Sequence, residues 1–219
     1  MGHRLLERAF DYFEAFGWPL ASAAWLAVFG SAVAMAVVLR RRDTRGCWLK
    51  ASVVGAIALG AHLLDYVVTL RITPDLAMEG NPIWRIVIDG AGVTIAKAYG
   101  LTGKILLAIL SAQAFAWYLS QRHTLWPKSA SGFLDFIKQL GAEAPPFANV
   151  QSFFAFSFAL FGPYFFYITF MNLSGDDASL YHALPSPPVA IVGYFSAVIA
   201  GYFVVQWRAF RRSTDRSAR

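Results

Sequence analysis

The chain has little charge and almost no cysteine, and both shortages narrow what it can be. Only 15% of its 219 residues are charged, whereas a soluble domain carries roughly 25%. Its one cysteine, Cys47, excludes an intrachain disulfide and a cysteine metal cluster. The strict apolar–polar alternation of an outer-membrane barrel is lacking as well. The sequence therefore fits neither a typical soluble domain nor a disulfide framework.

Long apolar runs make up most of the chain. Hydrophobic residues make up 57% of the chain, and they gather in runs of about twenty, the length at which a helix crosses some 30 Å of hydrocarbon. We therefore predict an all-α, polytopic helical membrane protein, a single membrane domain of residues 1–219 in a lipid bilayer. The expected spans are 20–39, 49–70, 98–119, 147–171 and 189–207. Gly162-Pro163 should kink the fourth span, because proline removes a helix hydrogen bond.

Three shorter helices are expected outside the spans. Residues 4–16 and 132–140 each place apolar side chains on one helical stripe, which is typical of amphipathic helices at a membrane surface. They either lie on the bilayer or dock a partner. Asn81 is a favoured N-cap and Pro82 a favoured first helical residue, so a short extracytoplasmic helix is predicted over 82–89.

The basic residues predict an orientation. Thirteen of them fall in one set of alternate loops and the C-terminal tail: Arg40, Arg41, Arg42, Arg45, Lys50, Arg122, Lys128, Lys138, Arg208, Arg211, Arg212, Arg216 and Arg219. Five fall on the opposite side: Arg4, Arg8, Arg71, Arg85 and Lys97. Cytoplasmic loops carry an excess of Lys and Arg, so we expect the N-terminus outside a bacterial-type inner membrane and the C-terminus in the cytoplasm. Because these residues flank spans and form no patch, nucleic acid is not an expected partner.

Polar residues share one face of the second span. They follow the i, i+3, i+4, i+7 pattern and are His62, Asp65, Tyr66 and Thr69. A charge inside a membrane helix is retained where it pairs, lines a cavity or has a function. Lys104 in the third span should lie about as deep as Asp65, roughly 7–9 Å below the outer surface, so these two are expected to pair. The loop that carries Glu79 and Asn81 should return to the same region.

Each of these residues also has a purely structural explanation. The Asp65–Lys104 pair can serve only to fix helix register. A histidine such as His62 is more often a hydrogen-bonded core residue than a ligand, and Asn81 can be only a helix cap. Lys97, on the same stripe as Lys104, is the alternative lysine for the site.

The order Asp65-x3-Thr69, Glu79-x-Asn81-Pro82 and then a lysine resembles a family of small bacterial and archaeal multi-pass membrane proteins of unknown function. The resemblance would cover about residues 50–115. Because no activity is known for that family, it implies a site at these residues and adds neither a reaction nor a cofactor.

The first function that fits is a protein whose outward-facing polar pocket binds or moves a small ion or solute. Its ligand-binding candidates are His62, Asp65, Thr69, Glu79, Asn81 and Lys104. The absence of detectable repeat symmetry argues against an ordinary secondary transporter.

Two alternatives remain open. The chain can be a non-catalytic accessory or scaffold subunit of a larger membrane complex. Gly193, Ala197 and Gly201 recur every four residues, and such small residues pack helices closely within one chain or across a homodimer. The third hypothesis is an intramembrane metal-assisted enzyme with His62, Asp65 and Glu79 as candidate ligands. The sequence lacks an HExxH pair and a G-x-S-x-G elbow, so no catalytic residue is assigned.

Overall fold

The computed structural model describes residues 2–42, 44, 46–77, 82–173 and 187–217, and every element among them is helical. The elements are α1 (Gly2–Arg40), α2 (Trp48–Ile72), α3 (Pro82–Gln121), the 3-10 turn η1 (Arg122–Leu125), α4 (Phe133–Gln139), α5 (Ala148–Ala159), α6 (Tyr164–Leu173) and α8 (Pro187–Ser217). Five stretches are long and apolar enough to cross a membrane: Ala21–Arg40, Trp48–Ile72, Ile83–Leu125, Ala148–Leu173 and Val189–Asp215. The predicted all-α fold with five such helices is confirmed, and it is compatible with an integral membrane protein.

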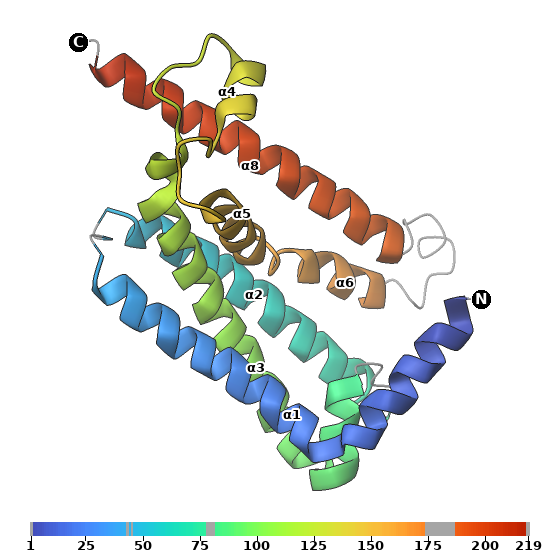
Figure 1. Ribbon diagram of the computed structural model, residues 1–219. Coiled ribbons are helices and arrows are strands. Elements are labelled where there is room, and N and C mark those ends of the chain that lie inside the picture. Colours follow the sequence, from blue (N-terminus) through green and yellow to red (C-terminus); the bar gives the residue numbers. More distant parts are fainter. Residues whose placement is uncertain (1, 43, 45, 78–81, 174–186, 218–219) are drawn as a thin grey trace.

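Small residues form the seam at the centre of the bundle. α3 packs against α1, α2 and α5, whereas α6 packs on α2 and α8 packs on α5 and α6 (Figure 1). On α2 the buried face begins with Ala51, Gly55 and Ala58. A Cβ on Gly55 would lie 2.7 Å from the Cβ of Ala112 on α3. The absence of a side chain at Gly55 therefore lets the two backbones approach closely, which is how helices pack when both lie in lipid.

The sequence predicted a separate amphipathic helix over 4–16, but in the structure this stretch is continuous with the first span. Helix α1 runs from Gly2 through the first span to Arg40. Figure 1 shows it bending sharply in its first half, the half whose sequence contains Pro19. Proline bends a helix without ending it when the flanking residues continue the helical pattern.

The predicted short helix at Pro82 exists, but it does not stop at Asp89-Gly90. Helical structure continues through 91, and Gly92 then adopts φ 83° and ψ 166°, where the chain turns back. Trp84, eight residues before this turn, packs on Gly100, eight residues after it. A Cβ on Gly100 would lie 1.7 Å from the Trp84 ring. Residues 82–103 therefore form a helical hairpin, and the third span begins earlier than the predicted residue 98.

The fourth span is broken, as Gly162-Pro163 predicts. Helix α5 ends at Ala159 and α6 starts at Tyr164. The hydroxyl of Tyr194 on α8 donates a hydrogen bond to the Leu160 carbonyl at the break. A Cβ on Gly162 would lie 2.5 Å from the Cβ of Ala58, so the break also lets this segment sit directly on α2.

Helix α4 packs on α8 through aromatic side chains. Phe136 is fully buried and its ring lies 5.4 Å from Trp207 and 5.2 Å from Phe210. The predicted helix at 132–140 is thus present as Phe133–Gln139. Its exposed Leu134 leaves the opposite side apolar, as expected for a helix at a membrane surface.

An amide network lies beneath α4 and is defined by Trp126, Asn149, Tyr202 and Gln206. The Trp126 indole nitrogen donates to Gln206 Oε1 at 3.0 Å, and the Tyr202 hydroxyl donates to Asn149 Oδ1 at 2.9 Å. Asn149 Nδ2 reaches the Leu140 carbonyl at 3.4 Å. The network therefore ties the segment after η1, α5 and α8 together.

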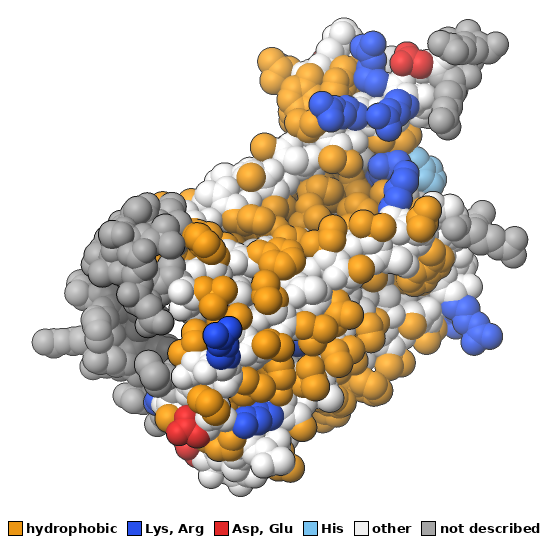
Figure 2. Space-filling view, turned by 180° about the vertical axis from the view of Figure 1, so that it is seen from behind, with side chains coloured by type: hydrophobic (Ala, Val, Ile, Leu, Met, Phe, Trp, Pro, Cys, Tyr) orange, Lys and Arg blue, Asp and Glu red, His pale blue; other side chains and the backbone are white. Residues whose placement is uncertain are grey.

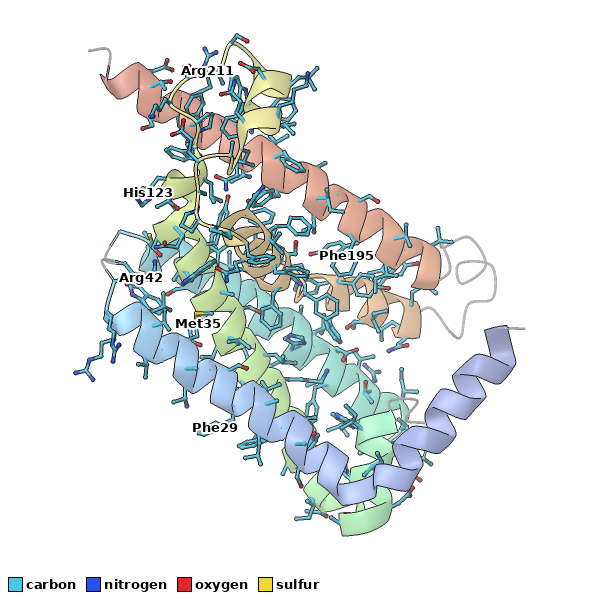
Figure 3. The ribbon with its side chains drawn as sticks, in the orientation of Figure 1. Phe29, Met35, Arg42, His123, Phe195 and Arg211 are labelled. Atoms are coloured by element: carbon cyan, nitrogen blue, oxygen red, sulfur yellow. The ribbon has the colours of Figure 1, made fainter. Side chains whose placement is uncertain are left out.

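Charge is concentrated at the ends of the bundle. Figure 3 places Arg42, His123 and Arg211 toward the same end, and Figure 2 shows mostly hydrophobic side chains over the middle of the visible face. The basic loops that the sequence assigned to one side are therefore near each other in space, among the residues described.

The small-residue stripe of α8 faces away from the rest of the chain. Gly193 and Ala197 are exposed and Gly201 is half-buried. A Cβ on either glycine would meet no atom within 4 Å among the described residues. Among the described residues the stripe therefore has no neighbouring helix, and whether it packs within the chain or across a homodimer stays a prediction.

Candidate functional site

The polar residues of α2 continue its packing face toward the end that leads to the hairpin. His62 and Asp65 are buried, with 2% and 8% of their surfaces exposed. They follow Gly55 and Ala58 on the same helical stripe. The part of α2 that packs closely on α3 has small residues, Gly55 and Ala58. One to two helical turns further along, the imidazole of His62 and the carboxylate of Asp65 fill the space between the two helices.

Asp65 and Lys104 form the predicted ion pair. Lys104 Nζ lies 2.6 Å from Asp65 Oδ2, and the two side chains are only 14% and 11% exposed. Lys104, and not Lys97, is therefore the lysine beside Asp65. Lys97 meets the hydroxyl of Tyr66 through its backbone carbonyl, at 3.1 Å. Because removing one partner would leave the other charged, buried and uncompensated, the pair couples α2 tightly to α3.

Phe165 on α6 completes the cluster. Its ring centroid lies 5.0 Å from Lys104 Nζ and 4.5 Å from the His62 ring. An aromatic face attracts a cation, so Lys104 is held between a carboxylate and a π system. The sequence analysis did not include Phe165 in the site. The only sequence signal was the Gly162-Pro163 break, after which α6 starts at Tyr164, one residue before Phe165.

A cavity of about 210 Å³ lies against this cluster. Its polar lining comes from His62 and Lys104, and α1 and the hairpin supply aromatic walls through Trp25, Trp84 and Tyr99. The backbone of Gly100 and Gly103 also lines it. Asp65 does not reach the cavity, so it lies behind Lys104 as the partner that neutralises the ammonium.

His62 is the unusual member of the cluster. Its Nδ1 atom is buried and has no hydrogen-bond partner among the described residues. A buried imidazole nitrogen without a partner carries a desolvation cost of about 1–3 kcal/mol. This observation differs from the expectation of a hydrogen-bonded core histidine, in a residue that also lines the cavity.

The other predicted site residues divide into two groups. Thr69 is half-buried on α2, one turn beyond Asp65, and does not line the cavity. Glu79 and Asn81 lie outside the described residues. Their loop leads directly into the hairpin, whose Ile83 and Trp84 do line the cavity.

No group of three histidine, cysteine, aspartate or glutamate side chains suited to a metal occurs among the residues that the structure describes. His62 and Asp65 supply two of the three ligands in the metal hypothesis. The third, Glu79, belongs to the undescribed loop, so that hypothesis stays a prediction.

Comparison with known proteins gives no further identification: no protein family model, curated protein or solved structure matches the chain. The resemblance through Asp65, Thr69, the Glu79 loop and a lysine therefore stays a prediction.

Proposed function

We propose that the chain is an integral inner-membrane protein that binds or moves a small ion or solute in the cavity beside Lys104. The observation that carries this proposal is a cavity lined by both His62 and Lys104, with Lys104 held in a buried ion pair to Asp65. A structural ion pair alone needs neither a neighbouring cavity nor an unsatisfied imidazole. A ligand would place its polar group beside His62 and Lys104 and stack its apolar part on the aromatic walls.

The orientation in this proposal follows from charge. The basic end of the bundle is assigned to the cytoplasm by the excess of Lys and Arg there. The hairpin and the cavity then lie in the outer half of the membrane. This orientation makes the cavity outward-facing.

The test is a thermal-shift screen of the full chain in detergent. The probes are chloride, nitrate, phosphate, acetate, ammonium, sodium and small amino acids. A ligand at a hundred times its Kd stabilises the folded state by about 2.7 kcal/mol, which shifts the melting temperature by several degrees. At least one probe should stabilise the wild type and leave Asp65→Asn and Gly103→Val unchanged.

The matched control is Ser111→Ala. Ser111 is buried on the same helix as Lys104, and its hydroxyl bonds only its own helix, at the Leu107 carbonyl. This variant should keep the shift. If no probe stabilises the wild type more than Asp65→Asn, the binding proposal fails.

A second function, an accessory subunit of a larger complex, is supported by the exposed stripe of Gly193, Ala197 and Gly201 on α8. Small exposed residues allow another membrane helix to approach closely. Gentle extraction at native expression level followed by native mass spectrometry separates the two proposals. A lone monomer would contradict the accessory role and leave solute binding intact.

A further inference from the structure

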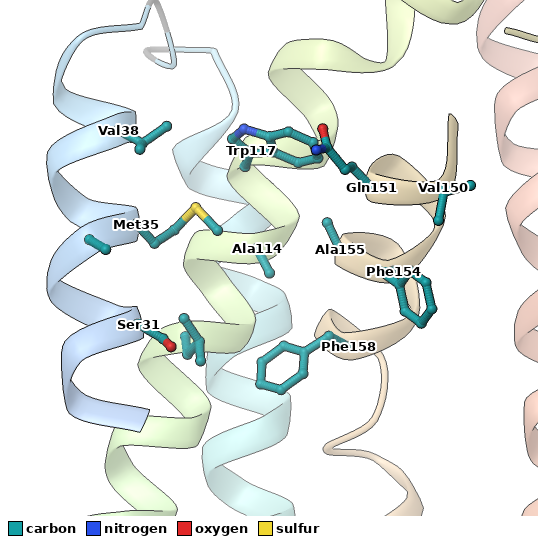
Figure 4. Close-up of a pocket in the computed structure, with 12 residues that line it drawn as sticks. Ser31, Met35, Val38, Ala114, Trp117, Val150, Gln151, Phe154, Ala155 and Phe158 are labelled. Carbon is teal, nitrogen blue, oxygen red and sulfur yellow. The ribbon is translucent and has the colours of Figure 1, made fainter. Parts of the chain in front are cut away.

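A second, larger cavity lies on the opposite half of the bundle from the ion pair. It has a volume of about 620 Å³ and is bounded by α1, α3 and α5. Figure 4 shows Met35 and Val38 of α1 on one side, Phe154 and Phe158 of α5 on the other, and Ala114 of α3 between them. Helices α1 and α5 both pack on α3, so the cavity is a groove whose floor is α3.

The depth of this groove matches one leaflet of a bilayer. Its lining extends from Ser31 to Val38 on α1, about 10 Å at 1.5 Å per residue. On α5 it extends from Val150 to Phe158, about 12 Å. Half of a 30 Å hydrocarbon core is about 15 Å. The groove thus lies within the leaflet at the basic end of the bundle.

One end of the groove is polar and positively charged. Trp117 and Gln151 lie at the same end as Val38 (Figure 4). Backbone hydrogen bonds from Arg41 to Val38 and from Arg42 to Leu39 continue the chain one turn past the groove. Both arginines are exposed.

We propose that this groove binds an acyl chain of an anionic phospholipid whose phosphate is held by Arg41 and Arg42. An apolar groove in the hydrocarbon region gains dispersion contacts when an acyl chain fills it. Arginines at the cytoplasmic end of membrane helices attract anionic headgroups, and their planar donors suit a phosphate.

The volume disfavours a helix from a second copy as the occupant. A helix about 10 Å across and 12 Å long needs on the order of 900 Å³. The groove holds about 620 Å³. A single acyl chain is much thinner than a helix and reaches the bottom of the groove from its own headgroup layer.

A neighbouring groove provides an internal comparison. It is lined by Phe153, Phe161, Phe195 and other apolar residues of α5 and α8, with a volume of about 460 Å³. On α8 its lining ends at Ile199, and the next basic residue of that helix is Arg208, about 13 Å further along. This groove should accept acyl chains without headgroup preference.

The experiment is native mass spectrometry of the full chain after exchange into mixed micelles of phosphatidylglycerol and phosphatidylcholine with identical acyl chains. The wild type should retain one phosphatidylglycerol with a preference of about thirtyfold, as two arginines at the headgroup would give. The double substitution Arg41→Gln/Arg42→Gln should reduce this preference toward onefold. The matched control Arg211→Gln/Arg212→Gln removes two exposed charges of α8 and should keep it.

Filling the groove tests the acyl-chain part of the proposal. Ala34 lines the groove and is exposed, whereas Ala36 is exposed on the same helix and does not line it. Ala34→Phe should lose the retained lipid, and Ala36→Phe should keep it.

Equal retention of both lipids by the wild type, or unchanged binding in Ala34→Phe, would overturn the proposal. So would a dimer that Ala34→Phe converts to a monomer, because it would assign the groove to a second copy. None of these variants touches the cavity beside Lys104, so failure here leaves the proposed solute site untouched.

Discussion

Two buried polar clusters at opposite halves of the bundle differ in how their members are satisfied. In the amide network, neutral groups of Trp126, Gln206, Tyr202 and Asn149 bond one another or a backbone carbonyl. In the outer cluster, which is formed by His62, Asp65, Lys104 and Phe165 and named after the orientation we propose, Asp65 and Lys104 form an ion pair and the Nδ1 atom of His62 has no partner among the described residues.

This difference distinguishes a structural hydrogen-bond network from a candidate binding site. Neutral hydrogen bonds contribute about 0.5–1.5 kcal/mol each and join helices without further requirements. A buried charge pair offsets its own desolvation only partly, so its retention beside a cavity needs another reason. The binding role that we propose therefore belongs to the outer cluster, and the amide network is expected to be structural.

The largest expected effect breaks the outer cluster. Replacing Lys104 by Met leaves Asp65 as an uncompensated buried carboxylate, which should destabilise the fold by about 3–5 kcal/mol. Asp65→Asn should also destabilise it, and the double variant should lose less than the sum of the two. Unfolding of the four proteins in mixed micelles measures this coupling. Strictly additive losses would show that the charges do not depend on each other.

The next effect concerns the hairpin that covers the outer cluster. Gly100→Ala places a Cβ 1.7 Å from the buried Trp84 ring, so the ring must move at a cost of about 1–3 kcal/mol. Gly103→Ala is the control, because a Cβ there meets no described atom within 4 Å. Unfolding and tryptophan emission should change in Gly100→Ala alone. Equal behaviour of the two variants would contradict the close contact of Trp84 with Gly100.

Breaking the amide network should lower stability without affecting ligand binding. Gln206 is fully buried, and Gln206→Leu would leave the Trp126 indole nitrogen without its acceptor, at a cost of about 1–3 kcal/mol. Any ligand-induced shift found in the thermal screen should survive in this variant. A variant of normal stability that no longer responds to ligand would reverse the assignment of roles.

The smallest effect is a pH dependence at α4. Hydrogen bonds to Asp135, first from the Ser131 backbone and then from the Gln139 side chain, hold the pKa of its carboxyl below 3.8. Because the folded pKa is depressed, this contribution is complete above the ordinary value and is lost as the pH falls through the folded one. An acid titration of tryptophan emission, which includes Trp207 against Phe136, should show a loosening of α4. Asp135→Asn should lack that acid step.

The sequence predicts much of this architecture because span length and composition are strong signals. The second span, expected at 49–70, is Trp48–Ile72, and the break at Gly162-Pro163 appears where proline forces it. The pairing of Asp65 with Lys104 also follows from depth alone. These features depend on local sequence and on the bilayer, so no tertiary knowledge is needed.

Other features depend on contacts that periodicity cannot supply. Gly193, Ala197 and Gly201 have the small-residue spacing, yet the seam inside the chain uses Ala51, Gly55 and Ala58 on α2. The spacing of small residues shows that they share one helix face, but it does not show which helix packs against that face. Phe165 was missed for the same reason, because an aromatic in an aromatic-rich span gives no sign of facing Lys104. The interruption between the short helix over 82–89 and the third span was expected, but its position at Gly92 and the packing of Trp84 on Gly100 were not, because they depend on a tertiary contact.

The turn at Gly92 also bears on which side of the bilayer the chain lies before its third crossing. A hairpin that folds back on itself returns the chain to the face from which it came, so α3 adds one crossing although it is 40 residues long. The crossing number stays odd with the hairpin or without it. A membrane-impermeant thiol reagent should therefore label cysteines placed at Asp75 and at Gly92 from the same compartment.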